Sequence, residues 1–79
     1  MNITVKYFGM ISDMVSSADE MEIFEDPVSI KEFREYLQQK YPDLLNITFS
    51  IALNHSIVGD EVIITNDSEI ALLPPFAGG

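Results

Sequence analysis

The chain has 79 residues, 47% of them hydrophobic, which is enough for one small domain with a single core. It has no cysteine, which excludes a disulfide framework, a thiolate metal site and a cysteine nucleophile, and no segment approaches the length of a membrane span. Thirteen acidic against four basic side chains give a formal net charge of −9, which would repel a phosphate backbone, so nucleic acid is not an expected partner.

The first elements expected along the chain are two strands. Residues 2–8 alternate apolar and polar side chains, which predicts a half-buried strand. The polar stretch 16–20 predicts a turn, and residues 21–24 predict a second strand that pairs with the first as a hairpin.

A helix is predicted next. Ser29 and Glu32 have the spacing of a capping box at its start. Ile30, Phe33 and Leu37 recur at helical spacing and predict its buried stripe, and Pro42 marks its end.

The rest of the chain predicts returning strands. Residues 48–54 predict a third strand, 57–58 a short fourth, and 69–73 the last. The order β-β-α-β-(β)-β predicts an α+β fold of the β-grasp, or ubiquitin-like, kind. In that fold a mixed sheet of four to five strands packs against one main helix, with the first and last strands adjacent in its centre.

Two side chains are out of phase with the core residues of their strands. Phe8 has the opposite parity to Ile3 and Val5, and Leu73 has the opposite parity to Ile70. Because successive strand side chains point to opposite faces, both are expected on the sheet face away from the helix, where Ile57 could join them. Such a patch is a candidate partner-binding surface; the alternative is that the strand ends twist and bury these residues.

The end of the chain predicts an extended arm. Pro74 and Pro75 fix φ and donate no hydrogen bond, so the sheet is expected to end before them and the chain to continue stiffly. Phe76 and Ala77 follow, and then Gly78 and Gly79, which lack a Cβ and can thread a narrow channel. We therefore expect a β-grasp domain over residues 1–73 and a flexible tail over residues 74–79. The alternative is an ordinary frayed terminus.

The run from Asp67 to Gly79 resembles the closing signature of the small, sulfur-carrying subunit of molybdopterin synthase. That signature is an acidic turn, an apolar strand, Pro-Pro, two variable residues and Gly-Gly. Residues 3–9 and the stretch from Leu53 to Val58 are also similar to that family. The chain departs from the family at Ser12, where a basic residue is usual, and near Asp67, where the turn lacks a glycine.

The resemblance implies a role for Gly79. In such carriers an activating enzyme of the ubiquitin-activating type uses ATP to adenylate the terminal carboxylate, and a sulfur donor protein converts it to a thiocarboxylate. The tail, Pro74 to Gly78, then inserts into the large synthase subunit, in a heterotetramer of two small and two large subunits. No bound cofactor, metal or catalytic side chain is implied for this chain, and the compartment expected is the cytoplasm.

Other functions remain open at this point. A sulfur carrier for thiazole synthesis shares the fold and the Gly-Gly end, a ubiquitin-like modifier would use the same carboxylate, and a binding-only domain would have an inert tail. His55 is expected to be a solvated turn residue rather than a catalytic base. The acidic residues between strand and helix are expected to form a solvated face rather than a cation site: Asp19, Glu20, Glu22, Glu25 and Asp26.

Overall fold

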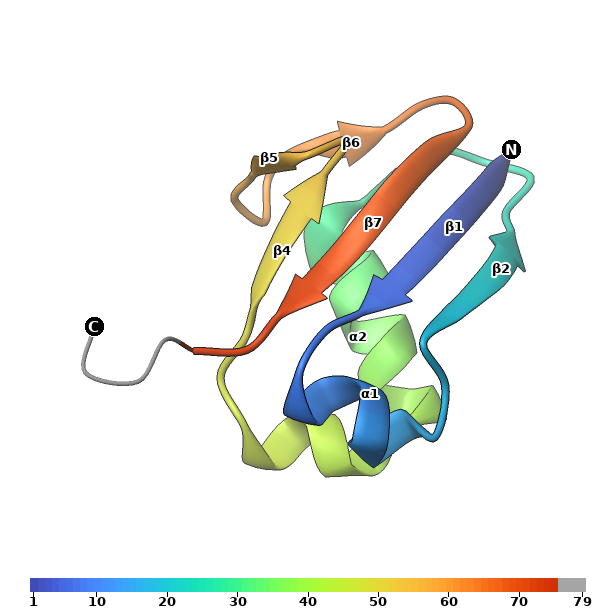
Figure 1. Cartoon of the computed structure of the whole chain (residues 1–79). Coiled ribbons are helices and arrows are strands. Elements are labelled where there is room, and N and C mark those ends of the chain that lie inside the picture. The colour runs from blue at the N-terminus through green and yellow to red at the C-terminus, as the bar shows by residue number, and fades with distance from the viewer. Residues whose placement is uncertain (76–79) are drawn as a thin grey trace.

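A computed structural model of the chain describes residues 1–75. Its helices and strands form one mixed layer of strands with helices on one side (Figure 1). In chain order the elements are β1 (Asn2–Tyr7), α1 (Met10–Val15), β2 (Asp19–Ile23), β3 (Val28–Ser29), α2 (Ile30–Lys40), the 3-10 helix η1 (Pro42–Asn46), β4 (Ser50–Leu53), β5 (Ser56–Ile57), β6 (Ile63–Ile64) and β7 (Ser68–Leu73).

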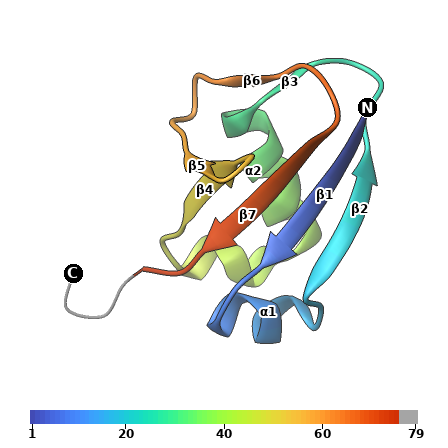
Figure 2. The ribbon, with the colours of Figure 1, turned by 45° about the horizontal axis from the view of Figure 1, so that its top comes forward.

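The main sheet has five strands in the order β2-β1-β7-β4-β5. β1 and β7 run parallel side by side, and the other neighbouring strands pair antiparallel. Helix α2 crosses behind this sheet, as the two ribbon views show (Figures 1 and 2). The architecture is that of the β-grasp fold, and the expected adjacency of the first and last strands is confirmed.

Helix α2 has the start and the buried stripe that its sequence predicts. Ser29 is the N-cap, and its side chain and that of Glu32 satisfy one another's backbone N–H groups in a capping box. Ile30, Phe33 and Leu37 are fully buried. Because Pro42 cannot continue the helical hydrogen bonds, α2 ends at Lys40 and η1 begins.

The core lies between α2 and the inner face of the sheet. Alternate residues of β1 and β7 contribute to it, since one parity of each strand faces the helix. Eleven of its side chains are less than 2% exposed: Phe33, Ile3, Ile11, Ile30, Leu37, Leu44, Ile51, Ile64, Ile70, Leu72 and Val5.

Two parts of the fold differ from the sequence prediction. A second α-helix, α1, connects β1 to β2, so these strands pair antiparallel but do not form a tight hairpin. Within it Ile11 and Val15, four residues apart, are buried together. β2 begins at Asp19, inside the stretch expected to be a turn, and a separate pair, β3 with β6, closes the other end of the molecule.

Candidate functional site

The end of β7 leaves the sheet beside the end of β1. The backbone N–H of Phe8 donates to Leu72 O at 3.3 Å, which continues the parallel pairing one residue past β1. β7 ends at Leu73, directly before Pro74, as the prolines predict. The remaining predicted tail residues, Phe76 to Gly79, lie outside the described residues, so the boundary between domain and tail stays a prediction.

Gly9 packs against Pro74, the first residue of the predicted tail. It was not among the site residues predicted from the sequence. Its backbone has φ 57° and ψ −136°, a conformation that essentially only glycine adopts. A Cβ built on Gly9 would lie 3.1 Å from Pro74 Cγ. The absence of a side chain at Gly9 therefore lets Pro74 pack against the turn between β1 and α1. A glycine immediately after a predicted strand was the available signal.

The outer face of the sheet carries the three residues predicted as a partner-binding patch. Phe8 is 46% exposed and Ile57 65% exposed, while Leu73 is half-buried. Phe8 and Leu73 follow the paired residues Tyr7 and Leu72, so they are neighbours at the ends of β1 and β7.

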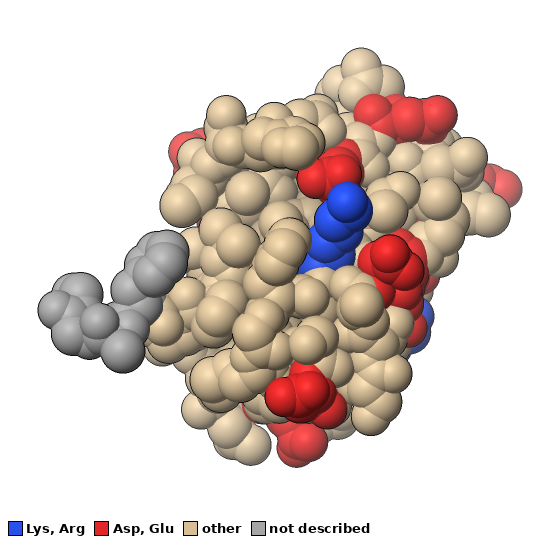
Figure 3. Space-filling view, viewed as in Figure 1, with Lys and Arg blue, Asp and Glu red and all other residues tan. Residues whose placement is uncertain are grey.

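Ile57 joins this face through the sheet register. Ile57 pairs with Ala52, which pairs with Ala71 of β7, two residues before Leu73. The part of the face around the end of β7 and along β4 is mainly uncharged, and the acidic side chains in view lie mostly toward its margins (Figure 3). The out-of-phase residues therefore do lie on the face away from α2, and their role in binding stays a prediction.

The expectation of a solvated acidic face is wrong for Glu20 and Glu22. Both lie on β2 opposite Val5 and Ile3, so they share the inner face of the sheet. Glu22 is only 7% exposed. The other three acidic residues of the stretch, Asp19, Glu25 and Asp26, are exposed as expected.

Lys40 and three tyrosines bind the two inward carboxylates. Lys40 Nζ lies 2.6 Å from Glu22 Oε2 and 3.6 Å from Glu20 Oε1. The Tyr36 hydroxyl donates to Glu22 at 2.7 Å, the Tyr7 hydroxyl donates to Glu20 at 2.8 Å, and the Tyr41 hydroxyl also donates to Glu20. A buried carboxylate is tolerated only when paired and hydrogen-bonded, and this cluster provides both.

The same contacts shift the pKa values of the cluster. Burial alone would raise the pKa of Glu20, but hydrogen bonds from Tyr41 and Tyr7 and the charge of Lys40 outweigh burial and lower it. The hydrogen bond to Glu22 raises the pKa of Lys40, although burial opposes that shift. Burial, followed by the hydrogen bond to Glu20, raises the pKa of Tyr7. The charged forms of Glu20 and Lys40 and the neutral form of Tyr7 are therefore stabilised in the fold.

His55 is exposed in the turn between β4 and β5, where its Nε2 lies 3.4 Å from Glu69 Oε2. Within residues 1–75, no group of three or more His, Cys, Asp or Glu side chains is placed to hold a metal ion. Over the same residues, no helix is both long and apolar enough to span a membrane.

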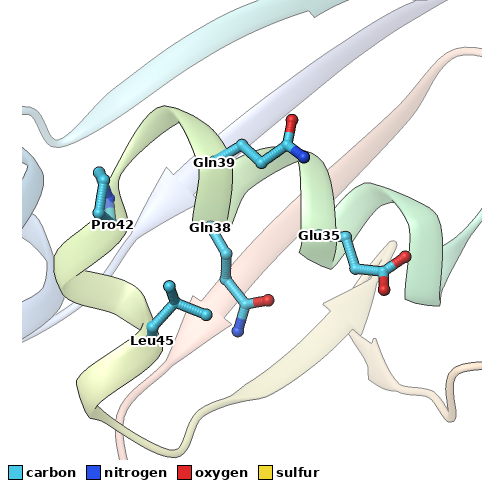
Figure 4. Close-up of a pocket in the computed structure, with 5 residues that line it drawn as sticks. All are labelled: Glu35, Gln38, Gln39, Pro42 and Leu45. Carbon is cyan, nitrogen blue, oxygen red and sulfur yellow. The ribbon is translucent and has the colours of Figure 1, made fainter.

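One hollow lies on the opposite side of the molecule, at the junction of α2 and η1 (Figure 4). Its volume is about 540 Å³, and it is lined by Glu35, Gln38, Gln39, Pro42 and Leu45. None of these residues lies on the sheet or at the end of β7, so the hollow is separate from the outer-face patch.

The chain matches the ThiS family over residues 5–79 and belongs to that family. It is 27% identical to a molybdopterin synthase sulfur carrier subunit from Caenorhabditis elegans, with 99% of this chain and 98% of the relative aligned. The same figures hold for the protein of that name from Caenorhabditis briggsae.

Solved structures show the same fold. A putative molybdopterin converting factor, subunit 1, from Pyrococcus furiosus superposes with a TM-score of 0.87 at 14% identity, covering 96% of this chain and 99% of the other. SAMP1 from Haloferax volcanii gives 0.83 at 16% identity over both full chains. A chain in the complex of subunits 1 and 2 of molybdopterin-converting factor from Helicobacter pylori gives 0.70 at 27% identity, again over both full chains.

Proposed function

We propose that this chain is the sulfur-carrier subunit of a molybdopterin synthase. The observation that carries the proposal is the ThiS-family match, which extends to Gly79 and so includes the Gly-Gly motif after β7. Two relatives aligned over nearly their whole length bear the name of that subunit. The central position of β7, which ends directly before Pro74, supports the idea that the fold presents the end of the chain to a partner.

In this proposal the α-carboxylate of Gly79 is the reactive group. A carboxylate is a poor acyl donor, so the activating enzyme first joins it to AMP from ATP and releases pyrophosphate. A sulfur donor protein then displaces AMP and leaves a thiocarboxylate on Gly79. That sulfur attacks the pterin precursor in the large subunit, and water then cleaves the resulting thioester, which leaves the sulfur on the pterin and restores the Gly79 carboxylate. Two such deliveries supply the two sulfurs of the dithiolene.

This chain contributes the cargo and its delivery, and the large subunit contributes the acid-base chemistry. Pro74 to Gly78 form the inserted arm, because the prolines stiffen it and the final glycines are narrow. Phe8, Ile57 and Leu73 dock on the large subunit through the mainly uncharged part of the outer face. The Helicobacter pylori structure, a complex of subunits 1 and 2, supports a partner of this kind.

The proposal is tested by changing only the end of the chain. Deleting Gly79, or adding one alanine after it, should abolish ATP-dependent adenylation and sulfur delivery in a reconstituted synthase reaction. The thermal unfolding midpoint should stay unchanged, because β7 ends six residues earlier, at Leu73. Asn46→Ala, at an exposed position at the end of η1, is the matched control and should retain activity. Full activity of the extended chain would overturn the mechanism.

The same reaction separates the two rival uses of an activated carboxylate. A carrier for thiazole synthesis would be adenylated and loaded with sulfur but would not support dithiolene formation with the large subunit. A protein modifier would instead form an amide with lysine side chains. Mass spectrometry detects this, after cleavage behind Phe76 by chymotrypsin, as an Ala-Gly-Gly remnant on other proteins.

A further inference from the structure

β2 is an edge strand with a free side. Within residues 1–75 it pairs only with β1. Backbone hydrogen bonds from Tyr7 N–H to Ala18 O and from Phe24 N–H to Met1 O show which residues of the two strands bond to each other. Because such bonded pairs alternate with non-bonded ones, the backbone groups of Glu20 and Glu22 point toward β1, and those of Met21 and Ile23 point outward.

The outward-pointing residues are also apolar and exposed. Ile23 is 75% exposed and Met21 57% exposed, and both lie on the outer face of the sheet, opposite Asn2 and Thr4. Natural edge strands often protect such a row with proline, charged side chains, a bulge or a covering element. β2 has no proline and pairs regularly with β1 over five residues, and its inward-pointing charges, Glu20 and Glu22, are bound by side chains of the same fold.

The inner face of β2 holds the strand in place. Glu20 and Glu22 are bound by Tyr7 of β1, by Tyr36 and Lys40 of α2, and by Tyr41, the cap of that helix. β2 is therefore already ordered before a partner binds. Adding a strand to an ordered edge costs less conformational entropy than adding it to an edge that must first become ordered.

Charge selects the kind of strand that fits. β2 carries three acidic residues in five, and Glu25 and Asp26 come soon after it. Pairing two copies of β2 would bring these carboxylates together on chains that each carry a charge of −9, so a second copy is disfavoured. A strand with basic side chains is attracted by the net charge of −9 and by the exposed Asp19, Glu25 and Asp26 at this edge. Apolar side chains opposite Met21 and Ile23 would pack on its outer face.

We propose that β2 is a strand-addition site for an extended segment of another protein in which basic and apolar residues alternate. The added strand runs antiparallel to β2 and enlarges the sheet at the edge opposite β5. The site is distinct from the patch of Phe8, Ile57 and Leu73, so it would remain available while the end of β7 is engaged. It lies beyond the sulfur-carrier function and does not depend on it.

The test uses the full chain and the peptide acetyl-Arg-Val-Arg-Val-Arg-Val-Arg-amide, followed by NMR. The peptide should shift the amide signals of residues 19–23 and slow hydrogen exchange at Met21 and Ile23. With valines on the outer face, their N–H groups point to β2 and those of the arginines point to solvent. N-methylation of the valines should therefore weaken binding by at least about tenfold, whereas N-methylation of the arginines should have little effect.

Two protein variants provide matched controls. Met21→Pro removes an outward N–H without breaking a bond to β1, so it should abolish peptide binding with a nearly unchanged thermal midpoint. Ile23→Lys keeps every backbone group and should weaken binding through charge and lost apolar contact, which guards against a folding defect in the proline variant.

Three results would overturn the proposal. The first is equal affinity for the two N-methylated peptides, which would mean attraction by charge alone. The second is a set of shifts centred on Phe8 and Leu73 rather than on β2. The third is protection of Met21 and Ile23 that grows with protein concentration in the absence of peptide, which would identify a second copy as the occupant.

Discussion

Glu20 and Glu22 can lie on the inner face of the sheet because the end of α2 carries side chains that bind carboxylates. Tyr36 and Lys40 are one helical turn apart on α2, and Tyr41 caps it, so all three reach β2 together. The alternation of β2 alone assigns these acids to one face, but only the register with β1 shows that this is the inner face. Their burial could not be predicted because their partners on α2 and its cap lie 14 to 21 residues away along the chain.

Replacing Glu20 tests this cluster through the pH dependence of stability. The folded pKa of Glu20 is below its usual value of 4.5, so its stabilisation is complete above that value and is lost as the pH falls through the folded pKa. Glu20→Gln should cost about 1–2 kcal/mol near neutral pH, discounted for partial exposure, and less at an acidic pH below 4.5. Urea unfolding at both pH values measures this, with Glu25→Gln as the exposed control. An equal loss of unfolding free energy at both pH values would show that the charge of Glu20 does not stabilise the fold through these contacts.

At alkaline pH the same cluster predicts that the free energy of unfolding falls as the pH rises. The pKa values of Tyr7, Tyr36, Tyr41 and Lys40 are all raised in the fold. Their stabilisation is therefore present below their ordinary values, 10.0 for tyrosine and 10.5 for lysine, and is lost as the pH rises further.

Phe8 tests the outer-face patch at the level of one side chain. If it anchors the large subunit, Phe8→Asp should weaken that binding by about 2 kcal/mol, as measured by calorimetric titration. Its thermal midpoint should fall far less than that of Ile51→Ala, because Ile51 is only 1% exposed and its truncation leaves a cavity. Unchanged affinity together with a collapsed midpoint would mean that Phe8 acts in the core.

Among the elements, the long local patterns predicted structure, whereas the short elements α1, β3 and β6 were not predicted. The capping box and apolar stripe of α2 and the alternation in β1 and β7 are each long enough to determine an element alone. α1 has only six residues, and β3 and β6 have two each. Such short elements are stabilised by tertiary contacts, which a local pattern does not contain.

The junction of β1 and α1 offers a test of how the tail leaves the sheet. Gly9→Ala should destabilise the fold by about 1–3 kcal/mol, because φ is positive and the new Cβ meets Pro74. It should also shift the NMR signals of Pro74. The control is Gly59→Ala, whose Cβ would lie nearest to the flexible carboxylate of Glu61. If the two variants unfold at the same temperature, Gly9 has no special role in supporting Pro74.

For the whole molecule, the charge of −9 and the mainly uncharged part of the outer face suggest a division of labour. Acidic margins would steer the chain to a basic partner, and apolar contacts would hold it there. Association with the large subunit should therefore slow as salt rises, since the Debye length falls from ~10 Å at 0.1 M to ~3 Å at 1 M. Stopped-flow mixing across that range measures both rates, and dissociation should change less. If the association rate does not change with salt concentration, the acidic charge serves solubility and does not steer the chain to its partner.

Whether Gly79 carries sulfur can be measured from the intact mass of the protein purified from its native cell. A sulfur carrier should contain a fraction of molecules heavier by the exchange of one oxygen for one sulfur, with fragmentation placing the change on Gly79. A protein whose mass always matches the unmodified sequence, even when it is purified with its activating enzyme, ATP and a sulfur source, would contradict the proposed sulfur-carrier function.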